Sequence, residues 1–195
     1  YGQPENERIF GPLERRGIKI HRQDGSHADH GLPDAIVYST AIEESNPDFV
    51  RAPGVPRLHR SQALKEGMAL SGKKMVAVTG SCGKTSVSAW LAETLWLLGL
   101  SPSMLSGGAV NRFCREDLVG NYLPGDGEHF VFEADESDKS LMAYHPDVAL
   151  ILNIGVDHYS EEELLELFGS FTRNVSGGLV IEAAAYEKIK DRVPA

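Results

Sequence analysis

One stretch constrains the fold of this chain most: an apolar run enters a glycine turn and then a long helical pattern. The run is Lys74–Thr79, the turn occupies Gly80–Gly83, and the helical pattern covers Thr85–Leu98. Gly99 follows directly, and glycine just after the last helical residue is a usual helix end. A strand joined to a helix by so short a turn is typical of a parallel sheet covered by helices. We therefore predict an α/β fold.

The rest of the chain repeats this alternation. Strands are expected at 17–20, 34–39, 129–133, 148–153 and 179–181, and helices at 5–16, 61–68 and 160–174. Continuous apolar strands between helices indicate parallel sheets with both faces covered. A boundary is expected near 71–73, between a first α/β unit and a second that begins with the Lys74–Thr79 strand. Residues 107–128 are rich in glycine, asparagine and charge, and we expect a long functional loop there.

The glycine turn has the composition of a phosphate-binding loop. Backbone N–H groups at a helix N-terminus favour an anion, and glycines let the backbone curl closely around it. Lys84 is placed to reach the β- and γ-phosphates of a nucleotide, and the Thr85 hydroxyl is placed to ligate magnesium. We therefore predict an ATP site with Mg2+. The ATP-binding residues expected are Gly80, Ser81, Cys82, Gly83, Lys84, Thr85 and Ser86.

The spacing of this loop departs from the common G-x-x-x-x-G-K-[ST] motif. The position five before Gly83 is Val78 rather than glycine, so the pattern is the shorter G-x-x-G-K-T. A plain glycine turn before a helix is the alternative interpretation. The agreement of strand, glycines, Lys84 and helix with one binding mechanism favours the phosphate site.

Acidic side chains follow the predicted strand at 129–133. Glu133, Asp135, Glu136 and Asp138 stand within six positions. Crowded carboxylates repel one another unless a cation is near, and magnesium is held by carboxylates together with phosphates. Because ligands of open α/β sheets bind at the carboxyl ends of the strands, we predict a magnesium site here. A solvated acidic loop is the alternative.

A second polar group follows the predicted strand at 148–153. Asn153, Asp157 and His158 come to the same sheet edge as the acidic cluster. Histidine is a possible metal ligand or phosphate contact. A polar surface residue is the alternative for His158.

Composition excludes several function classes. With 28 acidic and 19 basic residues the formal net charge is -9, which gives no basic footprint for nucleic acid. No apolar run is long enough to span a membrane, and the N-terminus lacks the apolar region of a signal peptide. We expect the two cysteines to be free thiols in a reducing, cytoplasmic compartment. The chain does not begin with methionine, so we expect a piece of a longer protein.

Three segments together resemble the ATPase domain of the Mur ligase family: residues 77–85, 133–138 and 153–158. Residues 35–42 and 55–60 look like the end of the family's N-terminal domain. The resemblance implies a partial Rossmann-like UDP-substrate domain at 1–72 and an incomplete P-loop ATPase-type central domain at 73–195. Within the family, Glu-Ala-Asp-Glu-Ser-Asp at 133–138 is most similar to the branch that joins L-alanine to UDP-N-acetylmuramate.

The resemblance also implies a reaction and a set of residue roles. Such enzymes build peptidoglycan by joining an amino acid or peptide to a UDP-muramyl carboxylate through an acyl phosphate made from ATP. The catalytic residues implied are Lys84, Glu133 and His158, and the metal ligands Thr85, Glu133 and His158. Asn153, Asp135 and Ser137 are implied as neighbours of the site. The partners implied are UDP-N-acetylmuramate and an amino acid, with ATP and Mg2+ as cofactors.

Departures from the family pattern leave alternatives open. Cys82 stands where the alanine-joining branch usually has histidine, and Tyr159-Ser160 replaces the residues that usually follow the motif histidine. The murein peptide ligase usually has tyrosine where Ser137 stands. A folate polyglutamate ligase fits less well, because 41–42 and 58–60 resemble the muramyl branch. A non-catalytic nucleotide-binding module and a small-molecule kinase are alternatives of other classes.

Overall fold

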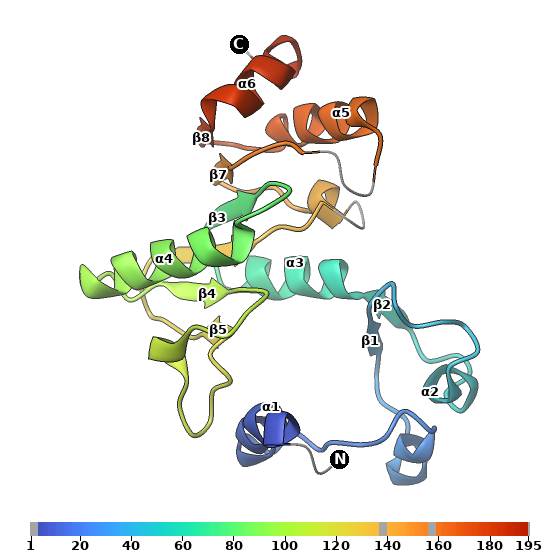
Figure 1. Cartoon of the computed structure of the whole chain (residues 1–195). Helices are drawn as coiled ribbons and strands as arrows, with labels where there is room; N and C mark the ends of the chain where they lie inside the picture. The colour runs from blue at the N-terminus through green and yellow to red at the C-terminus, as the bar shows by residue number, and fades with distance from the viewer. Residues whose placement is uncertain (1–3, 137–139, 156–158, 195) are drawn as a thin grey trace.

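A six-stranded sheet organises the larger part of the chain, in the order β5-β4-β6-β3-β7-β8 (Figure 1). Its strands are β3 Lys74–Thr79, β4 Ser103–Leu105, β5 Tyr122–Leu123, β6 His129–Glu133, β7 Val148–Ile151 and β8 Gly178–Ile181. All neighbouring strands pair in parallel except β4 and β5, which are antiparallel. The computed structural model describes residues 4–136, 140–155 and 159–194. The α/β class predicted from the sequence is confirmed.

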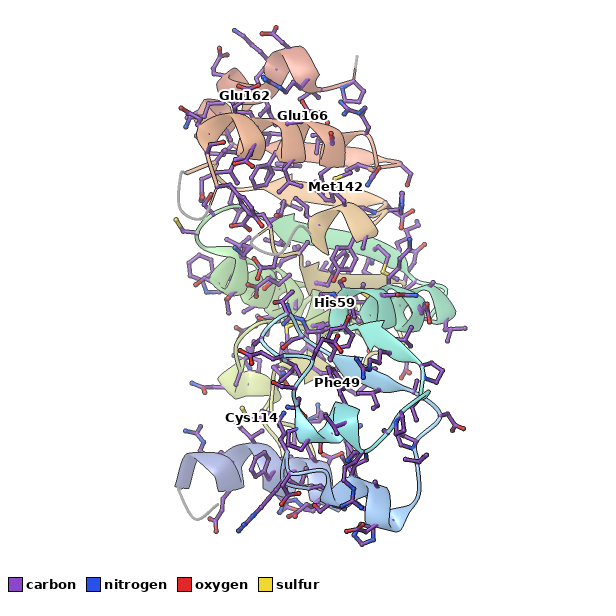
Figure 2. The ribbon with its side chains drawn as sticks, turned by 90° about the vertical axis from the view of Figure 1, so that its right-hand side faces the viewer. Phe49, His59, Cys114, Met142, Glu162 and Glu166 are labelled. Atoms are coloured by element: carbon purple, nitrogen blue, oxygen red, sulfur yellow. The ribbon has the colours of Figure 1, made fainter. Side chains whose placement is uncertain are left out.

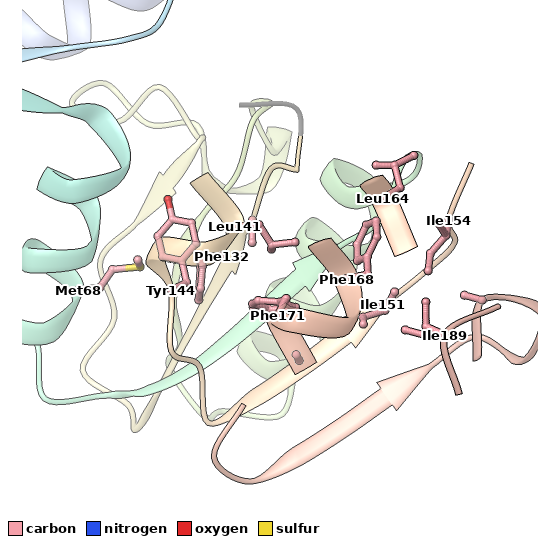
Figure 3. Close-up of a cluster of buried hydrophobic side chains, with 14 of the residues drawn as sticks. Met68, Phe132, Leu141, Tyr144, Ile151, Ile154, Leu164, Phe168, Phe171 and Ile189 are labelled. Carbon is pink, nitrogen blue, oxygen red and sulfur yellow. The ribbon is translucent and has the colours of Figure 1, made fainter. Parts of the chain in front are cut away.

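Helices cover both faces of this sheet. One face packs against α4 (Lys84–Leu97), with Val78, Val131 and Ala92 buried between them. The other face packs against α3 (Arg60–Leu70), α5 (Glu161–Thr172) and α6 (Ala183–Ile189). Phe168 and Phe171 of α5 are fully buried there (Figure 3). This core fixes β3 between two covered faces and so fixes the loop that leaves its carboxyl end.

The N-terminal part of the chain forms a second, two-stranded parallel sheet. The sheet pairs β1 (Ile36–Tyr38) with β2 (Arg57–His59), and the same part of the chain contains the helices α1 (Pro4–Arg15) and α2 (Pro47–Val50). Tyr38 meets Phe49 edge-on at a centroid distance of 5.4 Å and His59 at 5.7 Å. Figure 2 shows Phe49 of α2 and His59 of β2 in this part of the chain. Short 3-10 turns complete the chain at Ser26–His30, Asn111–Phe113, Ser140–Ala143 and Lys190–Arg192. The domain boundary near residue 72 stays a prediction.

The α1 helix also contacts the connection between β4 and β6. Arg16, just after α1, donates to the Asp117 carbonyl at 2.8 Å and to its carboxylate at 3.0 Å. Cys114 lies on the same connection and faces α1 across a cavity of about 500 Å3. The expected loop at 107–128 is therefore partly ordered by β5 and by an isolated bridge between Arg115 and Leu118.

The predicted strand at 17–20 is wrong. Gly17 adopts a left-handed φ of 80°, and its N–H donates to the Glu14 carbonyl. The Ile18 N–H donates to the Leu13 carbonyl, which completes the hydrogen-bond pattern of a Schellman cap. The apolar residues at 18 and 20 therefore follow a helix end, where the N–H groups of Gly17 and Ile18 already donate to carbonyls of the helix.

None of the helices in the described part of the chain has the length and apolar character needed to cross a membrane.

Candidate functional site

The phosphate-type loop lies between the carboxyl end of β3 and the start of α4. Gly80 has φ 135° and Gly83 has φ 86°, which are conformations that favour glycine. A Cβ added to Gly80 would lie 3.0 Å from the backbone nitrogen of Asn153. Gly83 is the N-cap of α4, so the helix's first N–H groups face the loop. The strand, turn and helix succeed one another as predicted, and they form the geometry that binds an anion.

A second segment, just beyond β7, holds this loop by side-chain hydrogen bonds. The Asn153 amide accepts from the Cys82 N–H at 2.9 Å and donates to the Cys82 carbonyl at 2.9 Å. The Ser81 hydroxyl donates to the Gly155 carbonyl at 2.9 Å and accepts from the Gly155 N–H at 2.9 Å. The Cys82 thiol is exposed, so its contribution to loop geometry comes from its backbone. Asn153 therefore acts on the shape of the loop, a role that the sequence alone left open.

The Lys84 side chain is mostly buried and lies beside negatively charged side chains. Its ammonium donates to the Glu136 carboxylate at 2.8 Å and to the Gly80 carbonyl at 2.9 Å, and lies 3.7 Å from the Asp135 carboxylate. Burial alone would lower the pKa of Lys84. The hydrogen bond from Lys84 to Glu136 and the negative charges of Glu136, Asp135 and Glu133 outweigh burial and raise that pKa above 10.5. Lys84 is thus positively charged at neutral pH, as phosphate binding requires.

Thr85 and Glu133 meet beside the loop. The Thr85 hydroxyl lies 3.1 and 3.0 Å from the two carboxylate oxygens of Glu133. The Gly107 N–H donates to the same carboxylate at 2.7 Å, and a Cβ at Gly107 would lie 2.9 Å from that oxygen. Glu133 is at the end of β6, Thr85 in the first turn of α4 and Gly107 just after β4. The segments that follow β4 and β3, the two neighbours of β6 in the sheet, therefore both contact the Glu133 carboxylate at the end of β6.

These donors fit magnesium and a triphosphate chemically. Magnesium prefers carboxylate and hydroxyl oxygens and keeps ligand positions for phosphate, which is what Thr85 and Glu133 offer. No group of three His, Cys, Asp or Glu side chains with metal-ligating geometry occurs among residues 4–136, 140–155 and 159–194. Four of the residues named from the sequence lie outside the described residues: Ser137, Asp138, Asp157 and His158. Ser86 lies exposed in the first turn of α4.

Space for a ligand lies next to these groups. A groove of about 680 Å3 runs beside Thr85 and Ser86, between α4 and the segment 108–112. Its walls include the exposed Trp90 and Arg112.

Reasoning from the sequence did not single out Gly107, and it named Glu136 only as a member of the acidic cluster. No sequence pattern pairs Glu136 with a lysine 52 positions away. The Gly-Gly pair at 107–108 in a long loop was the available signal for the N–H contact to Glu133.

Comparison with known families gives one match over most of the larger unit. The profile of the Mur ligase middle domain matches residues 78–181. The UDP-N-acetylmuramate–L-alanine ligase of Streptomyces coelicolor is 41% identical over 189 residues, which are 92% of this chain and 39% of that protein. The ligase of the same name from Gloeobacter violaceus is 36% identical over 188 residues, again 39% of its length. The chain thus spans about two fifths of the length of these curated relatives.

Solved structures give a concordant result. The UDP-N-acetylmuramate-alanine ligase of Thermotoga maritima superposes with a TM-score of 0.80 at 29% identity, covering 93% of this chain and 42% of that one. The UDP-N-acetylmuramate:L-alanyl-gamma-D-glutamyl-meso-diaminopimelate ligase of Neisseria meningitides gives 0.79 at 25% identity, covering 92% and 61%. Each superposition covers more than nine tenths of this chain.

Proposed function

We propose a ligase function for the protein that contains this chain, because the chain belongs to the Mur ligase family. The reaction proposed joins L-alanine to UDP-N-acetylmuramate with cleavage of ATP, a step of peptidoglycan synthesis in the cytoplasm. The observation that carries the proposal is the convergence of Lys84, Thr85 and Glu133 at one sheet edge, in a chain 41% identical to an alanine ligase.

The chemistry divides into two transfers. In the first, an oxygen of the muramyl carboxylate attacks the γ-phosphorus of ATP, the bond to the β-phosphate oxygen breaks, and ADP leaves. In the second, the amine of alanine attacks the acyl carbon of the resulting acyl phosphate, loses a proton, and expels inorganic phosphate. The amide bond forms in this second step.

The residues of this chain act on the phosphates of the first transfer. The N–H groups at the start of α4 and the ammonium of Lys84 would bind the β- and γ-phosphates. Negative charge builds up on the β-phosphate oxygen as its bond to the γ-phosphorus breaks, and these groups would stabilise that charge. Thr85 and Glu133 would hold magnesium, which when bound neutralises phosphate charge. The Asn153 amide would keep the loop in its binding conformation through Cys82. His158 remains a proposed ligand of a second magnesium ion, on the resemblance alone.

A phosphate-release assay tests the proposed reaction. ATP, magnesium and UDP-N-acetylmuramate would be mixed with alanine, other amino acids or the L-alanyl-γ-D-glutamyl-meso-diaminopimelate tripeptide. The protein would be this chain, and separately any longer polypeptide that contains it. Release stimulated by alanine supports the proposal, and release stimulated only by the tripeptide supports a murein peptide ligase. If no muramyl substrate stimulates release from any of these polypeptides, the ligase proposal is wrong.

A binding measurement tests the site independently of catalysis. Lys84→Ala should abolish ATP binding, because it removes the positive charge that contacts the β- and γ-phosphates. Retained binding in this variant would contradict the assignment of the loop. ATP binding without any stimulated phosphate release would favour the alternative of a non-catalytic nucleotide-binding module.

A further inference from the structure

Glu136 is a buried carboxylate beside the phosphate-type loop. Its exposed fraction is 7%, and the other buried polar residues in the described part of the chain are serines and threonines. Burying a charge is unfavourable unless a partner of opposite charge is close. The position of Glu136 therefore requires a specific cation.

That cation is Lys84. The two charged groups are 2.8 Å apart, and their side chains are 13% and 9% exposed for Lys84 and Glu136. A second N–H of the Lys84 ammonium donates to the Gly80 carbonyl of the same loop. An ammonium has three donors, so two of them are satisfied by the protein itself. The ammonium that would bind phosphate therefore already donates to the Gly80 carbonyl and to the Glu136 carboxylate.

A phosphate arriving at the loop meets this arrangement directly. It would compete with Glu136 for one ammonium, and the two anions would repel each other in a site of low dielectric constant. We propose that Glu136 is the counter-ion of Lys84 in the protein without nucleotide: it stabilises the empty loop, and ATP phosphates displace it from the lysine. This inference rests on the proposed function only in that the loop must bind ATP.

Two other roles for Glu136 predict different results. If Glu136 kept its hydrogen bond while the third Lys84 N–H reached the phosphate, loss of its charge would misplace the lysine and weaken ATP binding. If Glu136 only filled space, an amide of the same shape would leave ATP affinity unchanged. Displacement alone predicts a less stable empty protein together with tighter ATP binding.

The test is Glu136→Gln in the 195-residue chain. ATP affinity with magnesium would be measured by isothermal titration calorimetry, and stability without nucleotide by thermal unfolding. We expect the dissociation constant for ATP to fall about tenfold, the scale of one charged hydrogen bond, and the unfolding temperature of the empty protein to fall.

The matched control is Glu128→Gln. Glu128 also pairs with a lysine, Lys74, at 2.7 Å, but this pair is exposed and lies at the opposite end of β3. The variant makes the same change in net charge. Its ATP affinity should stay within about twofold of the wild type, since exposed pairs contribute little.

Several outcomes would overturn the inference. Unchanged or weaker ATP binding by Glu136→Gln overturns it, while the proposed function stands if the wild type binds ATP. If neither the wild type nor Glu136→Gln binds ATP, the loop assignment is overturned together with the inference. If Glu136→Gln does not fold, Glu136→Asp replaces it: the shorter side chain keeps the charge but loosens the contact. Affinity of Glu136→Asp at or below that of the wild type would equally overturn the inference.

Discussion

Replacing Asn153 with alanine should loosen the phosphate-type loop while leaving the sheet folded. The change removes both side-chain hydrogen bonds to the Cys82 backbone, each 2.9 Å long. The backbone contact from the Ser81 N–H to the Asn153 carbonyl, at 3.3 Å, does not depend on the side chain. The loop therefore loses the side-chain hydrogen bonds at Cys82 and keeps the backbone hydrogen bond from Ser81 to the segment that follows β7.

The size of the effect follows from these two bonds. A hydrogen bond contributes about 0.5–1.5 kcal/mol net, so two contribute about 1–3 kcal/mol to holding the loop closed. Because Asn153 is half-buried, water can replace part of the lost hydrogen bonding, and we expect the lower half of that range. ATP affinity should then fall about 5- to 30-fold. Global stability should change by less than about 1 kcal/mol, because the loop can open without unfolding the sheet.

Titration calorimetry with ATP and magnesium measures the affinity, and hydrogen exchange of the Cys82 amide reports the loop directly. Asn174→Ala is the matched control, since Asn174 also donates to backbone carbonyls, those of Met142 and Tyr144, away from the loop. It should leave both readouts unchanged. Wild-type affinity and unchanged exchange at Cys82 in Asn153→Ala would refute the argument that the Asn153 amide shapes the loop.

Further predictions concern the carboxylate of Glu133, the core and a helix cap. Thr85→Val removes the hydroxyl near Glu133 and should raise the magnesium concentration for half-maximal ATP binding about tenfold, measured by magnesium titration. Gly107→Ala places a Cβ 2.9 Å from the Glu133 carboxylate and should shift the same titration in the same direction. Phe168→Ala empties a fully buried position and should cost about 3–5 kcal/mol in urea unfolding. The backbone N–H groups at the start of α6 lower the pKa of Glu182. Stability from its charge is fully present above pH 4.5 and lost as pH falls through the lowered value, which an NMR acid titration would detect.

The central part of the fold could be predicted from the sequence because local and long-range signals agree there. The bounds of β3 coincide with the predicted run Lys74–Thr79, and α4 differs from its prediction by one residue at each end. The glycines at 80 and 83 are required by backbone conformation, so their function in the turn can be read locally. The capping box at Ser160 and Glu163 likewise fixes the start of α5.

Other elements could not be predicted because their signals are too short or depend on distant neighbours. The β4 strand has three residues, Ser103–Leu105, and its pairing with β6 decides its conformation. The segment after α1 carries two isoleucines and looked like a strand, but Gly17 turns it into a helix cap. The contact between Lys84 and Glu136 depends on the sheet order that places β6 beside β3. No pattern along the chain specifies that order.

The sheet also separates the acidic cluster into two functions that the sequence presented as one. Glu136 takes the ammonium of Lys84, so its charge is compensated within the protein. In the described part of the chain, Glu133 accepts hydrogen bonds from neutral groups, the Thr85 hydroxyl and the Gly107 N–H. Neutral donors orient a carboxylate without cancelling its charge. In the protein without nucleotide, a cation therefore gains more at Glu133 than at Glu136, and this difference favours Glu133 as the magnesium ligand of the cluster.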